Sequence, residues 1–308
     1  MKSIVVKEIS KNYRNVKALQ PVSFEVDKGE IFGLIGPDGA GKTTLIRILT
    51  TLLLPDSGAA WLEGNHCTDD FRRIRNIIGY MPGKFALYTD LSVEENMKFF
   101  ATVFGTTVDA NYDLVKLIYS RLEPFKKRRA GALSGGMKQK LALSCALIHR
   151  PKVLILDEPT TGVDAVSRKE FWQMLKNLRE KGITILVSTP YMDEAELCDR
   201  VGLIQKGRLM SVETPKEVVN NFGHDLFSVS GADNYKIMEY LKEITDEKDV
   251  QIFGQNIHFI NRNQIFTRNS LQQKLQEAGF DTIDVQKAEP NIEDCFIELT
   301  RNKNEANN

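Results

Sequence analysis

A run of nine residues from Gly36 to Thr44 combines glycines with a lysine and two threonines, a combination suited to holding a chain of phosphates. Its first eight residues, Gly36-Pro37-Asp38-Gly39-Ala40-Gly41-Lys42-Thr43, fit G-x-x-x-x-G-K-[ST] between an apolar run and a segment with helical periodicity. Glycines let backbone N–H groups close around phosphate oxygens, and the start of a helix adds partial positive charge. Lys42 would add a full charge near the β- and γ-phosphates, and the Thr43 hydroxyl would ligate Mg²⁺. A glycine-rich turn without a ligand is the weaker interpretation, because the strand–helix context that the motif requires is present.

Two adjacent carboxylates follow a second apolar run, "VLILDEP", and extend the same chemistry. Asp157 would hold Mg²⁺ through water, and Glu158 would orient or deprotonate the attacking water. An apolar strand that ends in two acids is common and usually structural. Because a phosphate-binding motif lies about 115 residues earlier, we interpret this pair as part of one nucleotide site.

A proline stands at a position where a reactive side chain would be expected. The segment "ITILVSTPYMDEAE" reads as a buried strand that ends at Thr189, and ligands bind at the carboxyl ends of strands in open α/β sheets. Pro190 has a fixed φ and no N–H, so the strand cannot continue through it. We expect Thr189 to cap a short acidic helix with Pro190 in its first position, and the acidic residues to complement the helix dipole.

The elements that position these residues alternate between strands and helices, which predicts an α/β fold with a mostly parallel sheet. The sequence predicts helices over 41–53, 135–149 and 164–181, and a hairpin that turns at Lys206-Gly207. Residues 84–150 contain a more charged helical insertion, and after residue 223 the pattern changes to short strands with two helical stretches. We therefore expect one domain over 1–223, a small α+β domain over 224–300 and a disordered tail over 301–308. In the small domain we expect strands near 226–230, 250–254 and 256–260 and helices near 235–244 and 270–278.

Composition limits the classes of partner. The 308 residues are 42% hydrophobic and carry 41 acidic and 41 basic residues, so no strong global field points to nucleic acid or to an anionic membrane. The basic run from Lys126 to Arg129 lacks interleaved aromatic residues, and we interpret it as a solvated loop rather than a nucleic-acid patch. The polar amino terminus and the lack of an apolar run of roughly 18 residues predict a cytoplasmic protein that does not insert into a membrane.

Cysteines and histidines add no further chemistry. The four histidines are scattered and offer no metal-ligand spacing, and the cysteines form no C-x-x-C pair, which indicates a reduced compartment. Cys145 shares one helical face with Met137, Leu141 and Ile148, so we expect a buried thiol there. The four cysteines are Cys67, Cys145, Cys198 and Cys295.

Three further motifs carry a family resemblance. Leu133-Ser134-Gly135-Gly136-Met137-Lys138-Gln139 resembles the LSGGQ signature of ABC-type ATPases and lies 20 residues before the carboxylate pair, as in that family. Thr161-Gly162-Val163-Asp164 is similar to the family's D-loop, and Tyr13 to the aromatic residue that stacks on adenine. The resemblance covers residues 3 to about 222, and "PNIEDCFIELT" resembles the ending of ATP-binding subunits of ABC-2-type exporters of the multidrug branch.

The resemblance implies a P-loop NTPase fold of the ABC type, with an N-terminal antiparallel β subdomain and an inserted helical subdomain. It further implies a head-to-tail dimer with a second such domain, of the same or a different chain, and two Mg·ATP between them. Ser134, Gly135, Gly136 and Gln139 would serve the partner's nucleotide. Integral membrane permease subunits would determine the transported substrate and hold the protein at the inner face of the membrane. The contact that we expect with them consists of Phe85, Leu87 and Tyr88.

The chain departs from the family pattern at three positions around the γ-phosphate. Pro190 replaces a histidine that contacts the phosphate and the water, Gly83 replaces the Q-loop glutamine, and Asp38 replaces an asparagine. Our hypothesis is that the chain binds Mg·ATP but hydrolyses it slowly at its own site, while its signature completes a partner's site. The alternatives are a fully active homodimeric motor, a clamp that only binds ATP, and a soluble ABC ATPase without a transport role.

Overall fold

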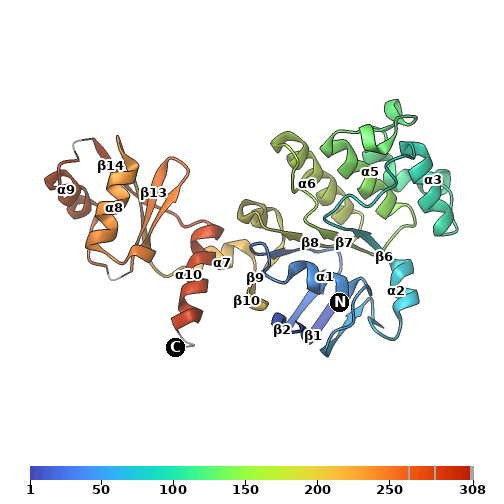
Figure 1. Cartoon of the computed structure of the whole chain (residues 1–308), viewed down its shortest axis with the longest axis horizontal. Coiled ribbons are helices and arrows are strands. Elements are labelled where there is room, and N and C mark those ends of the chain that lie inside the picture. Colours follow the sequence, from blue (N-terminus) through green and yellow to red (C-terminus); the bar gives the residue numbers. More distant parts are fainter. Residues whose placement is uncertain (263, 281, 306–308) are drawn as a thin grey trace. The chain divides into compact units, whose positions relative to one another are not determined.

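The computed structural model describes residues 1–262, 264–280 and 282–305. The chain forms two compact units, Met1–Pro215 and Lys216–Asn308, each with its own hydrophobic core (Figure 1). The sequence predicts the boundary after residue 223, whereas the second unit begins at Lys216. The change of composition near Gly223 marks the start of a strand, and a short helix of the second unit precedes it.

A six-stranded sheet forms the centre of the first unit. Its strand order is β10-β9-β3-β8-β7-β6, and only β10 runs antiparallel to its neighbour. The predicted hairpin turns at Lys206-Gly207, where both φ angles are positive, 47° and 76°. Every residue of β3, β7 and β8 is buried, because both faces of the sheet are covered. The strands are β3 (Ile31–Ile35), β6 (Ile78–Met81), β7 (Val153–Asp157), β8 (Thr184–Thr189), β9 (Arg200–Gln205) and β10 (Arg208–Glu213).

A second, antiparallel sheet of the first unit has the order β2-β1-β4-β5. Alternating residues of its strands are buried, as expected for a sheet with one face against a core. The rings of Phe24 and Phe32, from β2 and β3, stack with centroids 5.0 Å apart and join the two sheets. The strands are β1 (Lys2–Tyr13), β2 (Val16–Asp27), β4 (Ser57–Leu62) and β5 (Asn65–His66).

Helices cover both faces of the central sheet. Figure 1 shows α5 and α6 on one side of β7 and β8, and α1 with β1 and β2 on the other. The first predicted helix is shorter than expected and ends at Leu49, because Thr51 takes a left-handed φ of 62°. The helices are α1 (Lys42–Leu49), α2 (Phe71–Ile77), α3 (Val93–Val103), α4 (Tyr112–Tyr119), α5 (Gly135–Leu147) and α6 (Ala165–Glu180). The 3-10 helices are η1 (Asp109–Asn111), η2 (Glu123–Phe125), η3 (Ala130–Ala132) and the longer η4 (Met192–Leu197).

The second unit is a four-stranded antiparallel sheet, ordered β12-β13-β11-β14, packed against helices. Its strands and helices are α7 (Pro215–Asn220), β11 (Asp225–Gly231), α8 (Asn234–Ile244), η5 (Glu247–Asp249), β12 (Val250–Phe253), β13 (Asn256–Asn261), α9 (Arg268–Glu277), β14 (Ile283–Ala288) and α10 (Ile292–Glu305). Three strands and two helices fall where the sequence predicts them, while β14 and α10 were not expected. Buried Val229, Leu241, Ile257, Leu271 and Val285 share its core.

The end of the chain differs from the sequence-based expectation. Disorder was predicted from residue 301, but α10 continues to Glu305, and residues 306–308 lie outside the described part. Arg301 holds the helix through an ion pair with Asp246, at 2.6 Å, and another with buried Asp249. These two carboxylates come from a distant loop, so the ordering of the helix end is not visible in its local sequence.

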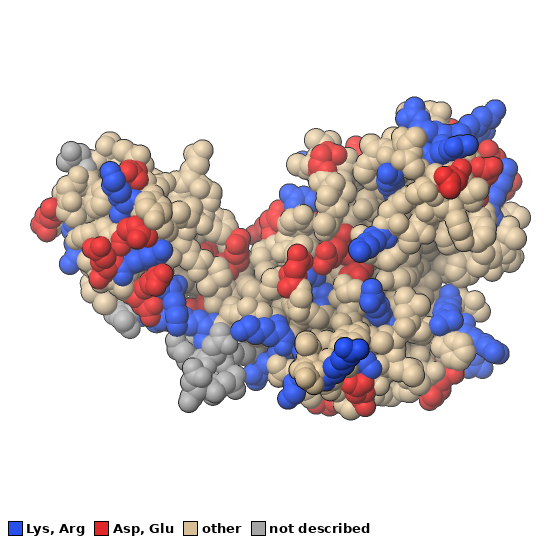
Figure 2. Space-filling view, in the orientation of Figure 1, with Lys and Arg blue, Asp and Glu red and all other residues tan. Residues whose placement is uncertain are grey.

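The four cysteines are free and buried, as predicted for Cys145. No helix within the described residues is both long and apolar enough to cross a membrane. On the face in Figure 2, acidic and basic side chains are interspersed. Lys126 to Arg129 are exposed, as expected for a solvated loop.

Candidate nucleotide site

The glycine-rich run forms a tight loop between β3 and α1. Gly36 has no room for a side chain, because a Cβ there would lie 2.1 Å from the Ile204 carbonyl oxygen. Gly41 has a φ of 105° and directly precedes the first residue of α1, so no side chain caps the first N–H groups of the helix. The Lys42 ammonium group is buried and donates to the carbonyl oxygens of Gly36, at 2.7 Å, and Pro37, at 3.1 Å. The loop is thus a compact ring of backbone around one cation, with helix N–H groups open to an anion.

The first carboxylate lies beside the threonine hydroxyl at the start of α1. Thr43 Oγ1 donates to Asp157 Oδ1 at 3.1 Å, and Ser188 Oγ donates to the same oxygen at 2.7 Å. A hydroxyl and a carboxylate are oxygen ligands of the kind that Mg²⁺ takes together with substrate phosphates. The described residues contain no cluster of three or more His, Cys, Asp or Glu side chains suited to a metal. Phosphate oxygens and water would therefore complete the coordination of a Mg²⁺ ion held by Thr43 and Asp157. Burial, followed by the charge of Asp157, raises the pKa of nearby Tyr80 to about 12 and keeps that phenol neutral.

The second carboxylate faces the loop. Glu158 has a left-handed φ of 49°, a conformation that costs a non-glycine residue on the order of 1 kcal/mol. Its N–H is held by Ser188, with the carbonyl oxygen at 3.0 Å and the hydroxyl at 3.1 Å. Glu158 Oε1 lies 3.2 Å from Lys42 Nζ, and about a quarter of the side chain is exposed. The backbone turn therefore directs this carboxylate toward the phosphate loop.

The three unusual residues do not share one environment. Pro190 follows Thr189, whose carbonyl oxygen accepts the Gly36 N–H at 3.3 Å, so the proline adjoins the phosphate loop. Gly83 lies beside the backbone of Asp157, because a Cβ on it would be 3.1 Å from the Asp157 carbonyl oxygen and 3.9 Å from Oδ2 of the same residue. Asp38 is exposed in the loop.

The predicted cap at Thr189 is wrong. The short helix is the 3-10 segment η4, which begins at Met192, and Pro190 precedes it instead of occupying its first position. Thr189 remains the last residue of β8, and its hydroxyl accepts the N–H of Tyr191 at 3.1 Å. The capping position of η4 is occupied by Tyr191, which makes no side-chain cap, so Thr189 lies two residues too early to cap this helix.

The signature motif forms a separate site at the start of α5. The Ser134 hydroxyl accepts the Met137 N–H at 3.4 Å, and both Ser134 and Gly135 are exposed. Gly136 is buried and has no room for a side chain, because a Cβ there would lie 2.8 Å from the Cβ of Ser167 in α6. Asp164 caps α6 by accepting the Ser167 N–H at 2.9 Å, so the D-loop and the signature meet at Ser167. Among the described residues, no hydrogen bond or ion pair joins Ser134–Gly136 to the phosphate loop.

Three other predicted residues lie on surfaces. Tyr13 ends β1 with 43% of its side chain exposed, and Gln139 is half-buried on α5. Phe85 and Leu87 line an apolar groove of about 680 Å³ between the end of β6, α3 and α5, which Gln139 also lines. Tyr88 lies outside the groove lining and packs edge-on against Phe99, with centroids 4.8 Å apart. His149 lines the same groove.

Sequence reasoning missed two groups that hold the site. Ser188 bonds both Asp157 and Glu158. The feature that could have identified it is a hydroxyl near the end of the strand β8, which neighbours β7 in the sheet. Glu194, interpreted as a helix-dipole partner, is instead buried and accepts the Thr160 hydroxyl at 2.7 Å. This bond joins the segment after Pro190 to the segment after Glu158, and no local pattern reveals it.

Comparisons with known proteins agree with this geometry. A family model described as ABC transporter matches residues 19–161. The probable multidrug ABC transporter ATP-binding protein YbhF of Escherichia coli (strain K12) is 39% identical over 286 residues, which are 92% of this chain but 49% of that protein. This chain therefore spans about half the length of that relative. Nod factor export ATP-binding protein I of Burkholderia lata is 34% identical over 298 residues, 96% of this chain and 95% of that protein.

A solved structure of the ATP-binding cassette MJ0796, a dimer in a post-hydrolysis state with ADP and Pi bound, has 25% identity and a TM-score of 0.62. The match covers 68% of this chain and 98% of that chain. The expected α/β fold of the ABC type is thereby confirmed. Because one relative above 30% identity is covered over almost its whole length, this chain belongs to the ABC transporter family of ATP-binding proteins.

Proposed function

We propose that this chain is an ATP-binding subunit of an exporter, which binds and hydrolyses Mg·ATP and couples both steps to transport through separate membrane subunits. The observation that carries the proposal is the contact of Lys42, Thr43, Asp157 and Glu158 around one loop at the carboxyl edge of the sheet. Two relatives named for multidrug transport and Nod factor export support the direction of transport.

The residues divide the work of hydrolysis between them. Lys42 and the N–H groups at the start of α1 would bind the β- and γ-phosphates. Thr43 and Asp157 would hold Mg²⁺, which neutralises charge that develops on the phosphate oxygens. Glu158 would orient the attacking water and accept its proton, since the Ser188 bonds fix its backbone.

A second ATP-binding domain would complete the site. Ser134 and Gly135 are exposed at the start of α5, where a hydroxyl and helix N–H groups can donate to a phosphate. Within the described part of the chain they make no bond to their own phosphate loop, so the nucleotide that they serve would belong to a partner. The dimer reported for MJ0796 supports this arrangement, and exposed Tyr13 would stack on adenine.

We further propose that the chain's own site turns over slowly. Pro190 adjoins the phosphate loop but has neither an imidazole nor an N–H, so it supplies no contact to the γ-phosphate. Gly83 lies beside Asp157 without a side chain that could reach Mg²⁺. Loss of one such contact typically lowers the rate by about 10²- to 10³-fold. The intact Ser188 contacts to Asp157 and Glu158 favour the second candidate, a fully active homodimeric motor.

The apolar groove lined by Phe85 and Leu87 is the surface that we propose for the membrane subunits. It lies between the end of β6, α3 and α5, and exposed Leu52 and Val103 form part of its lining. An amphipathic helix buries an apolar face in a groove of this kind.

The decisive experiment measures Mg·ATP turnover by the full chain and by Pro190→His, with ATP affinity determined for both. We expect similar affinity and a turnover about 10²-fold higher for the variant. Glu158→Gln is the matched control, because it should bind ATP without hydrolysing it. Adding Gly83→Gln to Pro190→His is a weaker test, since its Cβ would press on the Asp157 carbonyl at 3.1 Å.

If the native chain hydrolyses ATP as fast as Pro190→His, and both do so well above Glu158→Gln, the slow-site proposal is overturned and the active motor is favoured. If neither protein binds ATP, the nucleotide function itself is wrong. If both bind ATP but neither hydrolyses it, the chain is an ATP-dependent clamp and not a motor.

A further inference from the structure

A small pocket lies between α6 and η4. It has a volume of about 230 Å³. Its lining from α6 includes Arg168, Trp172 and Lys176, which a spacing of four residues places on one face of the helix. Its lining from η4 includes Asp193 and Glu194. The pocket thus separates the helix that follows the D-loop from the helix that follows β8.

Two residues of this pocket each have a buried polar atom without a partner. Trp172 is 2% exposed and Glu194 is 1% exposed. Neither Trp172 Nε1 nor Glu194 Oε2 makes a hydrogen bond within the described part of the chain. Only four buried side-chain polar atoms of the described residues lack a partner, so two of them at one pocket is a specific feature. The indole N–H is a donor and the carboxylate oxygen an acceptor, so each could satisfy the other.

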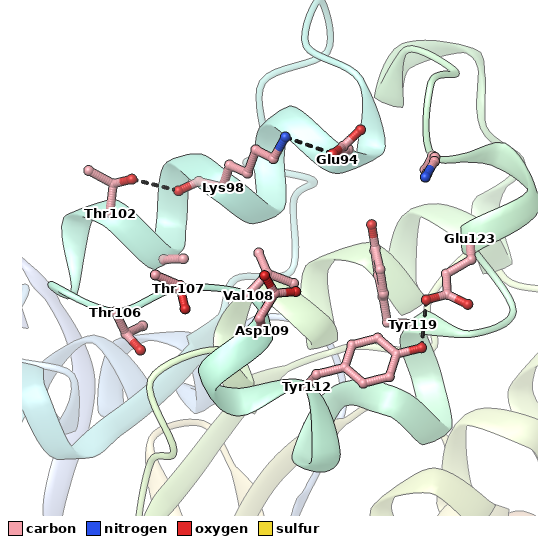
Figure 3. Close-up of a pocket in the computed structure, with 12 residues that line it drawn as sticks. Glu94, Lys98, Thr102, Thr106, Thr107, Val108, Asp109, Tyr112, Tyr119 and Glu123 are labelled. Carbon is pink, nitrogen blue, oxygen red and sulfur yellow. Dashed lines mark hydrogen bonds and ion pairs between the residues drawn. The ribbon is translucent and has the colours of Figure 1, made fainter.

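A larger hollow of about 810 Å³, lined by residues of α3 and α4, does not share this feature (Figure 3). In that hollow Glu94 pairs with Lys98 at 2.7 Å, and Glu123 accepts the Tyr112 hydroxyl at 2.5 Å. None of the four unpartnered atoms of the described residues belongs to its lining. Of these two pockets, the one between α6 and η4 is therefore the one whose buried groups require a further bond.

The bonded oxygen of Glu194 connects η4 to the nucleotide site. Glu194 Oε1 accepts the Thr160 hydroxyl at 2.7 Å, and Thr160 lies two residues after Glu158. The Thr161 N–H donates to the Glu158 carbonyl oxygen at 3.3 Å, so Thr160 is part of the turn that carries Glu158. A second bond to Oε2 from α6 would connect three segments through one buried carboxylate.

Other contacts already hold α6 beside the stretch that follows β8. The Arg168 guanidinium lies over the Tyr191 ring, 5.2 Å from its centroid, and 3.5 Å from the Asp193 carboxylate. These contacts involve half-buried and exposed groups at the rim of the pocket, and they leave its interior open. A small approach of η4 toward α6 can therefore occur without breaking the buried Thr160–Glu194 bond.

We propose that nucleotide binding closes this pocket and that Trp172 Nε1 then donates to Glu194 Oε2. The inference rests on the proposed nucleotide function, because the movement would begin at the phosphate loop. Glu158 is directed toward that loop and Pro190 adjoins it, so a nucleotide bound there would contact both segments that Glu194 joins. Closing the pocket satisfies both unpartnered atoms and makes Glu194 a positioning residue for Glu158.

The test observes the indole N–H groups of the full chain by NMR, with isotope-labelled tryptophan. The chain has two tryptophans, and Trp61→Phe identifies the signal of Trp172. The probe is Mg²⁺ with the non-hydrolysable β,γ-imido analogue of ATP, whose binding is measured by calorimetry. We expect the analogue to move the Trp172 proton signal downfield and to slow its exchange with solvent about tenfold, because the N–H gains a carboxylate acceptor.

Glu194→Gln tests the acceptor. It keeps the shape of the side chain and an oxygen for Thr160, but it offers Trp172 a neutral amide. A bond to a charged acceptor is roughly twice as strong as a neutral one, so the change in signal should fall to about half or less. Glu196→Gln is the matched control, because it removes the same charge from an exposed position of η4 that does not line the pocket.

A Trp172 signal that is the same with and without bound analogue would overturn the proposal, and this result needs no variant of Glu194. Equal changes in Glu194→Gln and Glu196→Gln would also overturn it. If calorimetry shows that the analogue does not bind, the nucleotide function itself is wrong and the proposed closure falls with it. The binding measurement therefore distinguishes the two failures.

Discussion

Replacing Ser188 by alanine tests how the two carboxylates are held. Ser188 is fully buried, and its hydroxyl donates to Asp157 Oδ1 at 2.7 Å. The substitution leaves the Asp157 carboxylate with the longer bond from Thr43 as its remaining hydroxyl contact. A hydrogen bond to a charged group contributes about 1.5–3 kcal/mol, so we expect a loss of about 2 kcal/mol in the free energy of unfolding. The Glu158 N–H still bonds the Ser188 carbonyl oxygen in the variant, so the loss of its bond to the Ser188 hydroxyl adds little to this change.

The matched control is Ser144→Ala. Ser144 is equally buried, but its hydroxyl donates to the Lys140 carbonyl within α5, and this neutral bond contributes about 0.5–1 kcal/mol. The chain has two tryptophans, Trp61 and Trp172, and both lie in the first unit. Tryptophan fluorescence during urea or thermal unfolding therefore follows that unit alone. For a unit of this size, 2 kcal/mol corresponds to a fall in Tm of about 4–8 °C.

The reasoning fails if Ser188→Ala is no less stable than Ser144→Ala. In that case the Asp157 carboxylate gains nothing measurable from the Ser188 hydroxyl, and the backbone of β7 and β8 alone would hold the site.

Three further predictions concern groups elsewhere in the first unit. Burial lowers the pKa of His149 below its ordinary 6.5. As pH falls below about 6.5, the unfolded chain binds a proton that the folded chain does not, so the free energy of unfolding decreases. His149→Phe should therefore flatten this part of a stability–pH profile measured by urea unfolding. Thr160→Val removes the donor to buried Glu194, and we expect a loss of about 2 kcal/mol in the same assay, whereas Thr160→Ser should retain most of the stability. Gly36→Ala would place a Cβ 2.1 Å from the Ile204 carbonyl oxygen, so it should abolish ATP binding or lower Tm strongly; a variant with native Tm and affinity would refute the close contact.

The sequence identifies those parts of the site that are contiguous. The loop from Gly36 to Thr43 and the pair Asp157-Glu158 are local patterns, and the adjacent apolar runs already indicate the strands that carry them. The contacts between these parts depend on which strands are neighbours. Ser188 reaches Asp157 because β8 pairs with β7, a fact that periodicity does not contain.

Elements with weak patterns were the ones missed. The strand β14 is short, has the polar residues Asp284, Gln286 and Lys287 among its six, and buries only Val285 fully, so its apolar alternation is too brief to predict a strand. The end of α10 depends on Arg301 and its two distant carboxylates. The turn after Thr189 differs from expectation because the choice between an α-helix and a 3-10 turn is decided by tertiary contacts such as the Thr160–Glu194 bond.

The burial of all four thiols has a practical consequence for spectroscopy. Burial raises the pKa of Cys67 to about 12 and raises those of Cys145 and Cys198 further, so the thiolate that reacts with maleimides and spin-label reagents is scarce in the native chain. Cys295 is buried as well. The native cysteines should therefore take up little label, and a single surface cysteine introduced outside the nucleotide and signature motifs, such as Ser120→Cys, would carry almost all of the probe. Distances between two such probes could follow the approach of two chains as ATP is added, without removal of any native cysteine.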